Sequence, residues 1–172
     1  MAAQPDVPAA ARNGWLRLDE AALLKACRLE RYRASGPGGQ RRNKVETAVR
    51  LRHAPSGIVA GAEESRSPEV NTRRALRRLR ERIALEVRSP FDPEAPSLPP
   101  ELVAQRGPRG RLAVNRSNPA YPIIAATLLD ALAAADGSYV KAARPLGLTT
   151  SQLLRFLRSD ASLWRGVSER RA

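Results

Sequence analysis

A run of residues that break helices and strands, Gly36-Pro37-Gly38-Gly39, interrupts the chain between two stretches of alternating apolar and polar side chains. The run predicts an exposed, turn-rich loop, because glycine tolerates positive φ and proline fixes φ. Without a Cβ at Gly38 and Gly39, another molecule can approach the main chain closely. Gln40 then offers a backbone N–H and an uncharged amide. The basic Arg41-Arg42-Asn43-Lys44 would attract a polyanion to the same place, which suggests chemistry at the end of an RNA.

The stretches on either side of this loop predict strands. Cys27–Arg33 alternates loosely between apolar and polar residues, and Val45–His53 alternates clearly. Ala54-Pro55-Ser56-Gly57 is turn chemistry, and a returning strand is expected to begin at Ile58–Ala60. The pattern therefore predicts a β-hairpin within a small antiparallel sheet.

Two helices are predicted around these strands. Asp19 and Glu20 precede a short apolar run, which is typical of a helix with acids in its first turn. From Pro68 to about Val87 apolar residues recur every three or four positions, as in an amphipathic helix. We expect this helix to pack its apolar stripe across the sheet and to leave its arginines outside: Arg73, Arg74, Arg77, Arg78, Arg80 and Arg82.

The predicted fold class is therefore α+β, followed by a small helical part. Eight of the fourteen prolines lie in residues 88–122, which predicts a stiff spacer rather than a packed element. We expect a disordered N-terminus over residues 1–14, a sheet-and-helix domain over 15–88, a linker over 89–117 and a helical domain over 118–172. The basic residues of the linker are consistent with RNA contact or with simple solubility: Arg106, Arg109, Arg111 and Arg116.

The charge balance points to a polyanionic partner. The formal net charge is +13, and contacts made by such a surface weaken as salt rises. Residues 16–88 hold 18 Lys and Arg against 9 Asp and Glu, a net charge of +9, whereas residues 120–172 hold 7 against 4, a net charge of +3. The positive charge therefore lies mainly in the part that contains the glycine loop.

Several classes of protein are disfavoured. Cys27 is the only cysteine, so neither an intrachain disulfide nor a cysteine-built metal site is expected. No metal-ligand cluster or cofactor motif is present, and neither a metal nor a cofactor is predicted. The N-terminus has no secretory pattern and no stretch approaches the length of a membrane span, so we expect a cytoplasmic protein without membrane attachment. His53, the only histidine, is expected to be structural.

The loop and its flanks resemble the catalytic loop of class I peptide chain release factors. The matching residues read Arg33-Ala34-Ser35-Gly36-Pro37-Gly38-Gly39-Gln40-Arg41-Arg42-Asn43-Lys44. The resemblance continues through Thr47–Arg50, His53–Val59 and Ser65–Asn71, and covers roughly residues 19–87. It implies a small antiparallel sheet packed against one long basic helix, as the hydropathy pattern also predicts.

In the resembled family this loop enters the peptidyl transferase centre of the large ribosomal subunit and promotes attack of water on the peptidyl-tRNA ester. The resemblance implies that Gly38, Gly39 and Gln40 are catalytic, with the Gln40 N–H stabilising the negative charge that develops in ester hydrolysis. Residues assigned to RNA contact are Arg41, Arg42, Asn43, Lys44, Arg73, Arg74, Arg77 and Arg78. Arg41-Arg42 departs from the His-Val or Asn-Val of many members, which leaves the depth of loop insertion open.

The C-terminal part resembles a helix-turn-helix of bacterial DNA-binding regulators. Helices are predicted over Ile123–Ala135, from Ser138 through Ala143 and over Ser151–Arg158, with a turn at Leu146-Gly147-Leu148. Pro145 puts the geometry of the first helix of the motif in question. A three-helix bundle that docks on another protein or on ribosomal RNA is the alternative.

Together these observations predict a peptidyl-tRNA hydrolase of release-factor type that acts on stalled ribosomes without codon recognition. The codon-independent form is expected because only about 20 residues precede the loop-bearing unit, and none resembles a stop-codon reader. The expected partners of a monomeric chain are large-subunit ribosomal RNA and peptidyl-tRNA, and a methyltransferase acting on Gln40 is left open. Two rivals stay open: a non-catalytic RNA-binding protein, and a DNA-binding regulator that acts through the helix-turn-helix.

Overall fold

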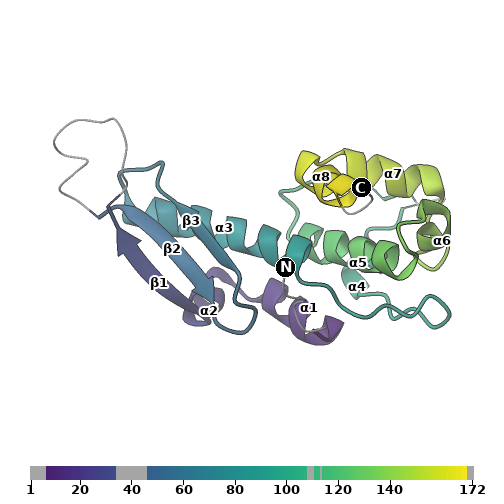
Figure 1. The fold of residues 1–172 in the computed structure, drawn as a ribbon, viewed down its shortest axis with the longest axis horizontal. Helices are drawn as coiled ribbons and strands as arrows, with labels where there is room; N and C mark the ends of the chain where they lie inside the picture. Colours follow the sequence, from purple (N-terminus) through teal and green to yellow (C-terminus); the bar gives the residue numbers. More distant parts are fainter. Residues whose placement is uncertain (1–6, 34–45, 108–110, 113, 170–172) are drawn as a thin grey trace. The chain divides into compact units, whose positions relative to one another are not determined.

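The computed structural model describes residues 7–33, 46–107, 111–112 and 114–169. The fold is α+β, as predicted, with a three-stranded antiparallel sheet and several helices (Figure 1). The chain divides into two compact units. We call Arg17–Ile83 the sheet unit, and we call the segments up to Leu16 and from Ala84 onward the helical unit.

The sheet unit contains the three predicted strands in the order β1-β2-β3. They are β1 (Cys27–Tyr32), β2 (Ala48–His53) and β3 (Val59–Ala62), and both pairings are antiparallel. Alternate residues of β2 are buried and exposed, so the period of two seen in the sequence corresponds to two faces of the sheet. Leu29 lies opposite Leu51 on the buried face.

The two predicted helices of this unit form at the predicted places. α2 (Glu20–Lys25) is capped by Asp19, whose carboxylate accepts a hydrogen bond from the backbone N–H of Ala22 at 2.7 Å. α3 (Pro68–Glu86) lies across one face of the sheet (Figure 1). Burial of its apolar stripe against the strands stabilises the unit, because apolar surface is removed from water. The buried side chains include Val49, Leu51, Ala60, Leu76, Leu79 and Ile83.

The helical unit contains the predicted helices and further ones that the sequence analysis missed. The predicted helices are α5 (Tyr121–Ala134), α6 (Tyr139–Ala143) and α7 (Thr150–Arg158). The additional helices are α1 (Ala9–Arg17), α4 (Pro100–Ala104) and α8 (Ala161–Glu169). α4, α5, α6, α7 and α8 share one apolar core, to which α5 contributes Ile124 and Leu128 among others.

The structure differs from the expectation at the N-terminus and in the proline-rich segment. Residues 9–14, expected to be disordered, form the first part of α1. Residues expected to form an unpacked spacer instead contribute to the core, since Leu102 of α4 is fully buried and Phe91 and Leu98 pack against the same cluster. Proline spacing indicated a stiff extended backbone, but it carried no information on which apolar side chains between the prolines find a core.

A buried group of charges holds the first helix within the helical unit. Arg12 is completely buried, and its Nη1 donates to Asp130 Oδ2 at 2.5 Å. Arg88 Nη1 and the backbone N–H of Ser89 donate to Asp130 Oδ1 at 2.8 and 3.1 Å. Asn13 Oδ1 accepts from the remaining nitrogens of Arg12 at 3.2 and 3.1 Å. Burial raises the pKa of the Asp130 carboxyl, and the positive charges of Arg88 and Arg12 act against this shift.

A second buried carboxylate starts α8. Asp160 Oδ1 accepts from the backbone N–H of Ser162 at 2.8 Å, and its Oδ2 accepts from the Tyr121 hydroxyl at 2.6 Å. Arg116 Nε lies 3.1 Å from the same Oδ2. Burial alone would raise the pKa of Asp160, but these hydrogen bonds and the Arg116 charge hold it below its usual value. Asp160 therefore serves as the N-terminal cap of a helix that the sequence analysis did not predict.

Of the described helices, none is both long and apolar enough to cross a membrane.

Candidate functional site

The predicted catalytic residues lie outside the described residues. This holds for Gly38, Gly39 and Gln40, and equally for the RNA contacts predicted at Arg41-Arg42-Asn43-Lys44. Their assignment therefore stays a prediction. The structure does describe the scaffold on both sides, which ends at Arg33 and resumes at Glu46.

The two ends of this scaffold lie together because the pairing extends to the last residue of β1 and the first residue of β2. Tyr32 is opposite Ala48 in the ladder. Just beyond them, Arg33 Nε lies 3.7 Å from Glu46 Oε1, and both side chains are more than half exposed. An ion pair this exposed is worth about 0–1 kcal/mol, so the strand pairing is what holds the two ends together.

Asn71 anchors the chain where it returns toward β2. This side chain of α3 is fully buried, and its amide nitrogen donates to the carbonyls of Thr47 at 2.7 Å and Ser65 at 2.8 Å. Its Oδ1 accepts from the backbone N–H of Ser65 at 3.0 Å. Both bonds to Ser65 fix the corner between the strand and the helix. The additional bond to Thr47, just before β2, was not foreseen.

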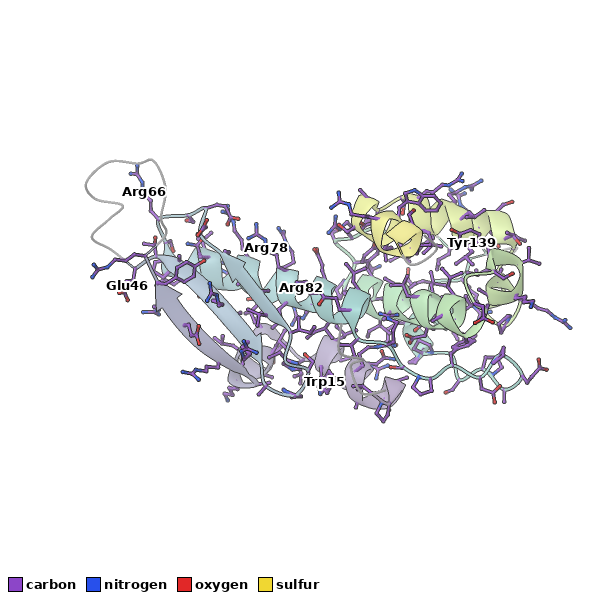
Figure 2. The ribbon with its side chains drawn as sticks, in the orientation of Figure 1. Trp15, Glu46, Arg66, Arg78, Arg82 and Tyr139 are labelled. Atoms are coloured by element: carbon purple, nitrogen blue, oxygen red, sulfur yellow. The ribbon has the colours of Figure 1, made fainter. Side chains whose placement is uncertain are left out.

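A further exposed side chain, that of Arg66, lies at the same end of the sheet. Figure 2 shows Arg66 and Glu46 at the end where β1 stops and β2 starts. Arg66 is exposed in the turn that leads into α3. On the outer face of the sheet, the Arg50 guanidinium lies 5.1 Å from the centre of the Tyr32 ring. Arg66, Arg50 and Tyr32 were not among the predicted RNA contacts, although Arg50 is exposed in the alternating pattern of β2.

The arginines of α3 were expected outside the sheet contact, and the structure adds that some of them bind groups of the sheet unit. Arg78 donates to the carbonyl of Gly61 at 2.7 Å and to Glu64 Oε1 at 2.5 Å. Arg82 donates to the carbonyl of Val59. Figure 2 labels both side chains along the part of α3 that runs beside β3. Their long side chains reach the outward carbonyls of an edge strand and cover that edge.

The other predicted RNA contacts on α3 differ in exposure and in ion pairing. Arg74 lies 3.8 Å from Glu64, and hydrogen bonding by Arg78 lowers the pKa of this carboxyl. Arg73 and Arg77 are exposed, and within the described part of the chain neither forms an ion pair. Of the four predicted RNA contacts on α3, Arg73 and Arg77 are therefore the ones available to a partner.

His53 is structural, as expected. The ring is fully buried at the end of β2, and its Nδ1 lies 2.8 Å from Ser56 Oγ across the turn. Burial lowers its pKa, so the neutral ring is favoured. Among the described residues, no group of three or more His, Cys, Asp or Glu side chains could hold a metal ion.

The segment that contains the glycine loop is similar to a known family. Residues 23–96 match the RF-1 domain. This match confirms the resemblance to release factors for that segment, which includes β1, β2, β3, α3 and the Gly38-Gly39-Gln40 sequence between the first two strands.

Three curated relatives of this chain carry the name peptide chain release factor 1. The protein of Chloroherpeton thalassium is 51% identical over 55 residues, which are 32% of this chain and 15% of that protein. The protein of Gluconobacter oxydans is 50% identical over 56 residues, 33% of this chain and 16% of its own length. The protein of Ehrlichia canis is 44% identical over 68 residues, which are 40% of this chain and 18% of that protein. The alignments thus span less than a fifth of each relative.

Proposed function

We propose that this chain promotes hydrolysis of the ester between a nascent peptide and tRNA on the ribosome, without reading a stop codon. The observation that carries the proposal is the RF-1 match over residues 23–96, which contains Gly38-Gly39-Gln40. The described ends of β1 and β2 support it, because the strand pairing brings Arg33 and Glu46, which flank this sequence in the chain, together at one end of the sheet.

The chemistry asked of the loop is charge stabilisation. Attack of water on the ester develops negative charge on the carbonyl oxygen and on the departing ribose oxygen. The backbone N–H of Gln40 donates to that charge, and one such preorganised donor in a dry site is worth roughly 10²–10³ in rate. Gly38 and Gly39 allow the main chain to approach the ester. The neutral Gln40 side chain positions the water, and ribosomal RNA supplies the rest of the site.

Basic residues then hold the sheet unit on ribosomal RNA. Arg41, Arg42 and Lys44 are proposed to contact phosphates beside the loop, with Asn43 bracing it. Arg73 and Arg77 extend this surface along α3, because both are exposed and neither forms an ion pair within the described residues. Asn71 positions the return of the chain into β2 through its bond to the Thr47 carbonyl.

Release of labelled peptide from ribosomes programmed with a truncated mRNA tests the function directly. We expect the purified chain to release peptide from these ribosomes, and to release it no faster when a stop codon occupies the decoding site. Codon independence is wrong if release requires the stop codon. Hydrolysis is wrong if the chain binds ribosomes that carry peptidyl-tRNA and leaves the peptide attached, which is the outcome expected of a non-catalytic RNA-binding protein.

The division of the α3 arginines gives a second prediction. Replacing Arg73 and Arg77 together by alanine should weaken ribosome binding and reduce its dependence on log salt by about one unit per lost phosphate contact. Sedimentation with large subunits at several salt concentrations measures both quantities. As the matched control, Arg78→Ala should instead lower stability, since it removes the bonds to Gly61 and Glu64. Equal effects of the two changes on the salt slope would contradict the assignment.

A further inference from the structure

The proposed release function does not use the helix-turn-helix formed by α6 and α7. α6 ends at Ala143, so Pro145 lies in the turn rather than inside the helix. Gly147 has a φ of +66°, a left-handed conformation that favours glycine and lets the chain reverse. Thr149 and Gln152 form a reciprocal capping box, with bonds of 3.2 and 2.8 Å, at the start of α7. α7 is therefore held in a defined position on the helical unit.

One face of α7 is buried and the opposite face is open. Leu153, Phe156 and Leu157 enter the core of the helical unit. Ser151, Arg155 and Arg158 are exposed, and their spacing of four and three residues places them along one side of the helix. The helix thus presents a polar and basic stripe to solvent.

The exposed charge of the segment that contains this stripe has a single sign. Over Tyr139–Ser168 the only acid is Asp160, which is buried and caps α8. The exposed charged side chains of that range are all basic: Lys141, Arg144, Arg155, Arg158 and Arg165. They are contributed by α6, the turn that follows it, α7 and α8, so positive charge lies on the elements that flank the stripe as well as on α7 itself.

Two contacts fix the positions of cations at the motif. The Arg158 guanidinium lies 5.0 Å from the centre of the Trp164 ring, which holds this side chain at the end of α7. Arg106 lies against Gly147, where any Cβ would collide with its guanidinium nitrogen. Arg106 therefore brings a positive charge to the turn between α6 and α7.

We propose that α7 binds in the major groove of double-stranded DNA. An α-helix with its side chains is about 10–12 Å across, and the major groove of B-form DNA is about 12 Å wide. The major groove of A-form RNA is too narrow and deep for side chains to read. In this arrangement Ser151 and Arg155 face base edges, while the cations of α6 and α8 meet phosphates on either side.

Fluorescence anisotropy with the full chain tests this proposal. The probes are a labelled DNA duplex of about two helical turns and an RNA duplex of the same sequence. Arg155→Glu is expected to weaken binding to the DNA duplex about tenfold or more. Lys25→Glu is the matched control, because it makes the same charge change at an exposed residue of the sheet unit and should alter binding much less. We expect the wild-type chain to prefer the DNA duplex.

A second variant separates loss of binding from loss of folding. Ser151→Asp places an acid in the first turn of α7, which favours the helix while repelling phosphate. It should therefore preserve stability and still weaken binding to the DNA duplex. The proposal is overturned if the two duplexes bind equally, or if Arg155→Glu and Lys25→Glu weaken binding to the same extent. Loss of ribosome binding by Arg155→Glu, with no DNA binding by the wild type, would overturn it in favour of a ribosomal contact.

Discussion

Gln40→Pro is expected to lower the rate of peptide release about 10²–10³-fold, because proline removes the backbone N–H that stabilises the developing negative charge. Ribosome binding should be retained, since the basic residues that contact RNA are unchanged. The measurement is single-turnover release of labelled peptide from ribosomes with truncated mRNA, at saturating concentrations of the chain.

Gln40→Ala is the matched control for this prediction. It keeps the N–H and removes only the amide that positions water, so release should fall by less than with proline. Equal losses in the two variants would assign the chemistry to the side chain rather than to the main chain. Release at the wild-type rate by Gln40→Pro would mean that the loop is not catalytic.

Asp130→Ala is expected to destabilise the helical unit by about 3–5 kcal/mol, the usual cost of removing one partner from a buried ion pair. The variant leaves the Arg12 guanidinium buried opposite no carboxylate. It also removes the acceptor of the Ser89 N–H and one of two acceptors of Arg88 Nη1, which keeps only the Ala126 carbonyl. Because a buried charge without a counterion is so costly, the loss should far exceed that of an ordinary surface substitution.

Urea unfolding followed by tryptophan fluorescence measures this effect. Both tryptophans, Trp15 and Trp164, belong to the helical unit, so their signal reports on that unit. Glu94→Ala is the matched control, since Glu94 is exposed and its replacement should change stability by less than about 0.5 kcal/mol. A midpoint for Asp130→Ala that coincides with that of Glu94→Ala would show that the buried charges contribute little.

Elements with local start and stop signals were predictable from the sequence. Asp19, Ser138 and Thr149 each accept a backbone N–H at the start of the helix predicted to follow, and the alternation of β2 corresponds to its buried and exposed faces. These signals act within a few residues, so the order of residues is enough to read them. The family match over residues 23–96 was likewise readable, because the ordered series of residues in that segment is specific.

The candidate site was predictable only in part. Gly38, Gly39 and Gln40 remain assigned by resemblance to a family, whereas the arginines of α3 could be sorted only in three dimensions. The periodicity of α3 placed Arg73 and Arg78 alike on its polar side. Whether an arginine is free depends on an acceptor elsewhere, and Arg78 has one in the outward carbonyl of Gly61.

The sequence by itself determined the helices and strands that carry their own caps and periodicity, and it determined the residue types of the loop. Only the tertiary structure decided that α1 forms part of a core, because Arg12 needs a carboxylate 118 residues away, at Asp130. The tertiary structure likewise decided where α8 begins. Asp160 caps this helix and also accepts a hydrogen bond from the Tyr121 hydroxyl. A buried charge is tolerated only where a counterion lies beside it, and in this chain the fold places the two partners together.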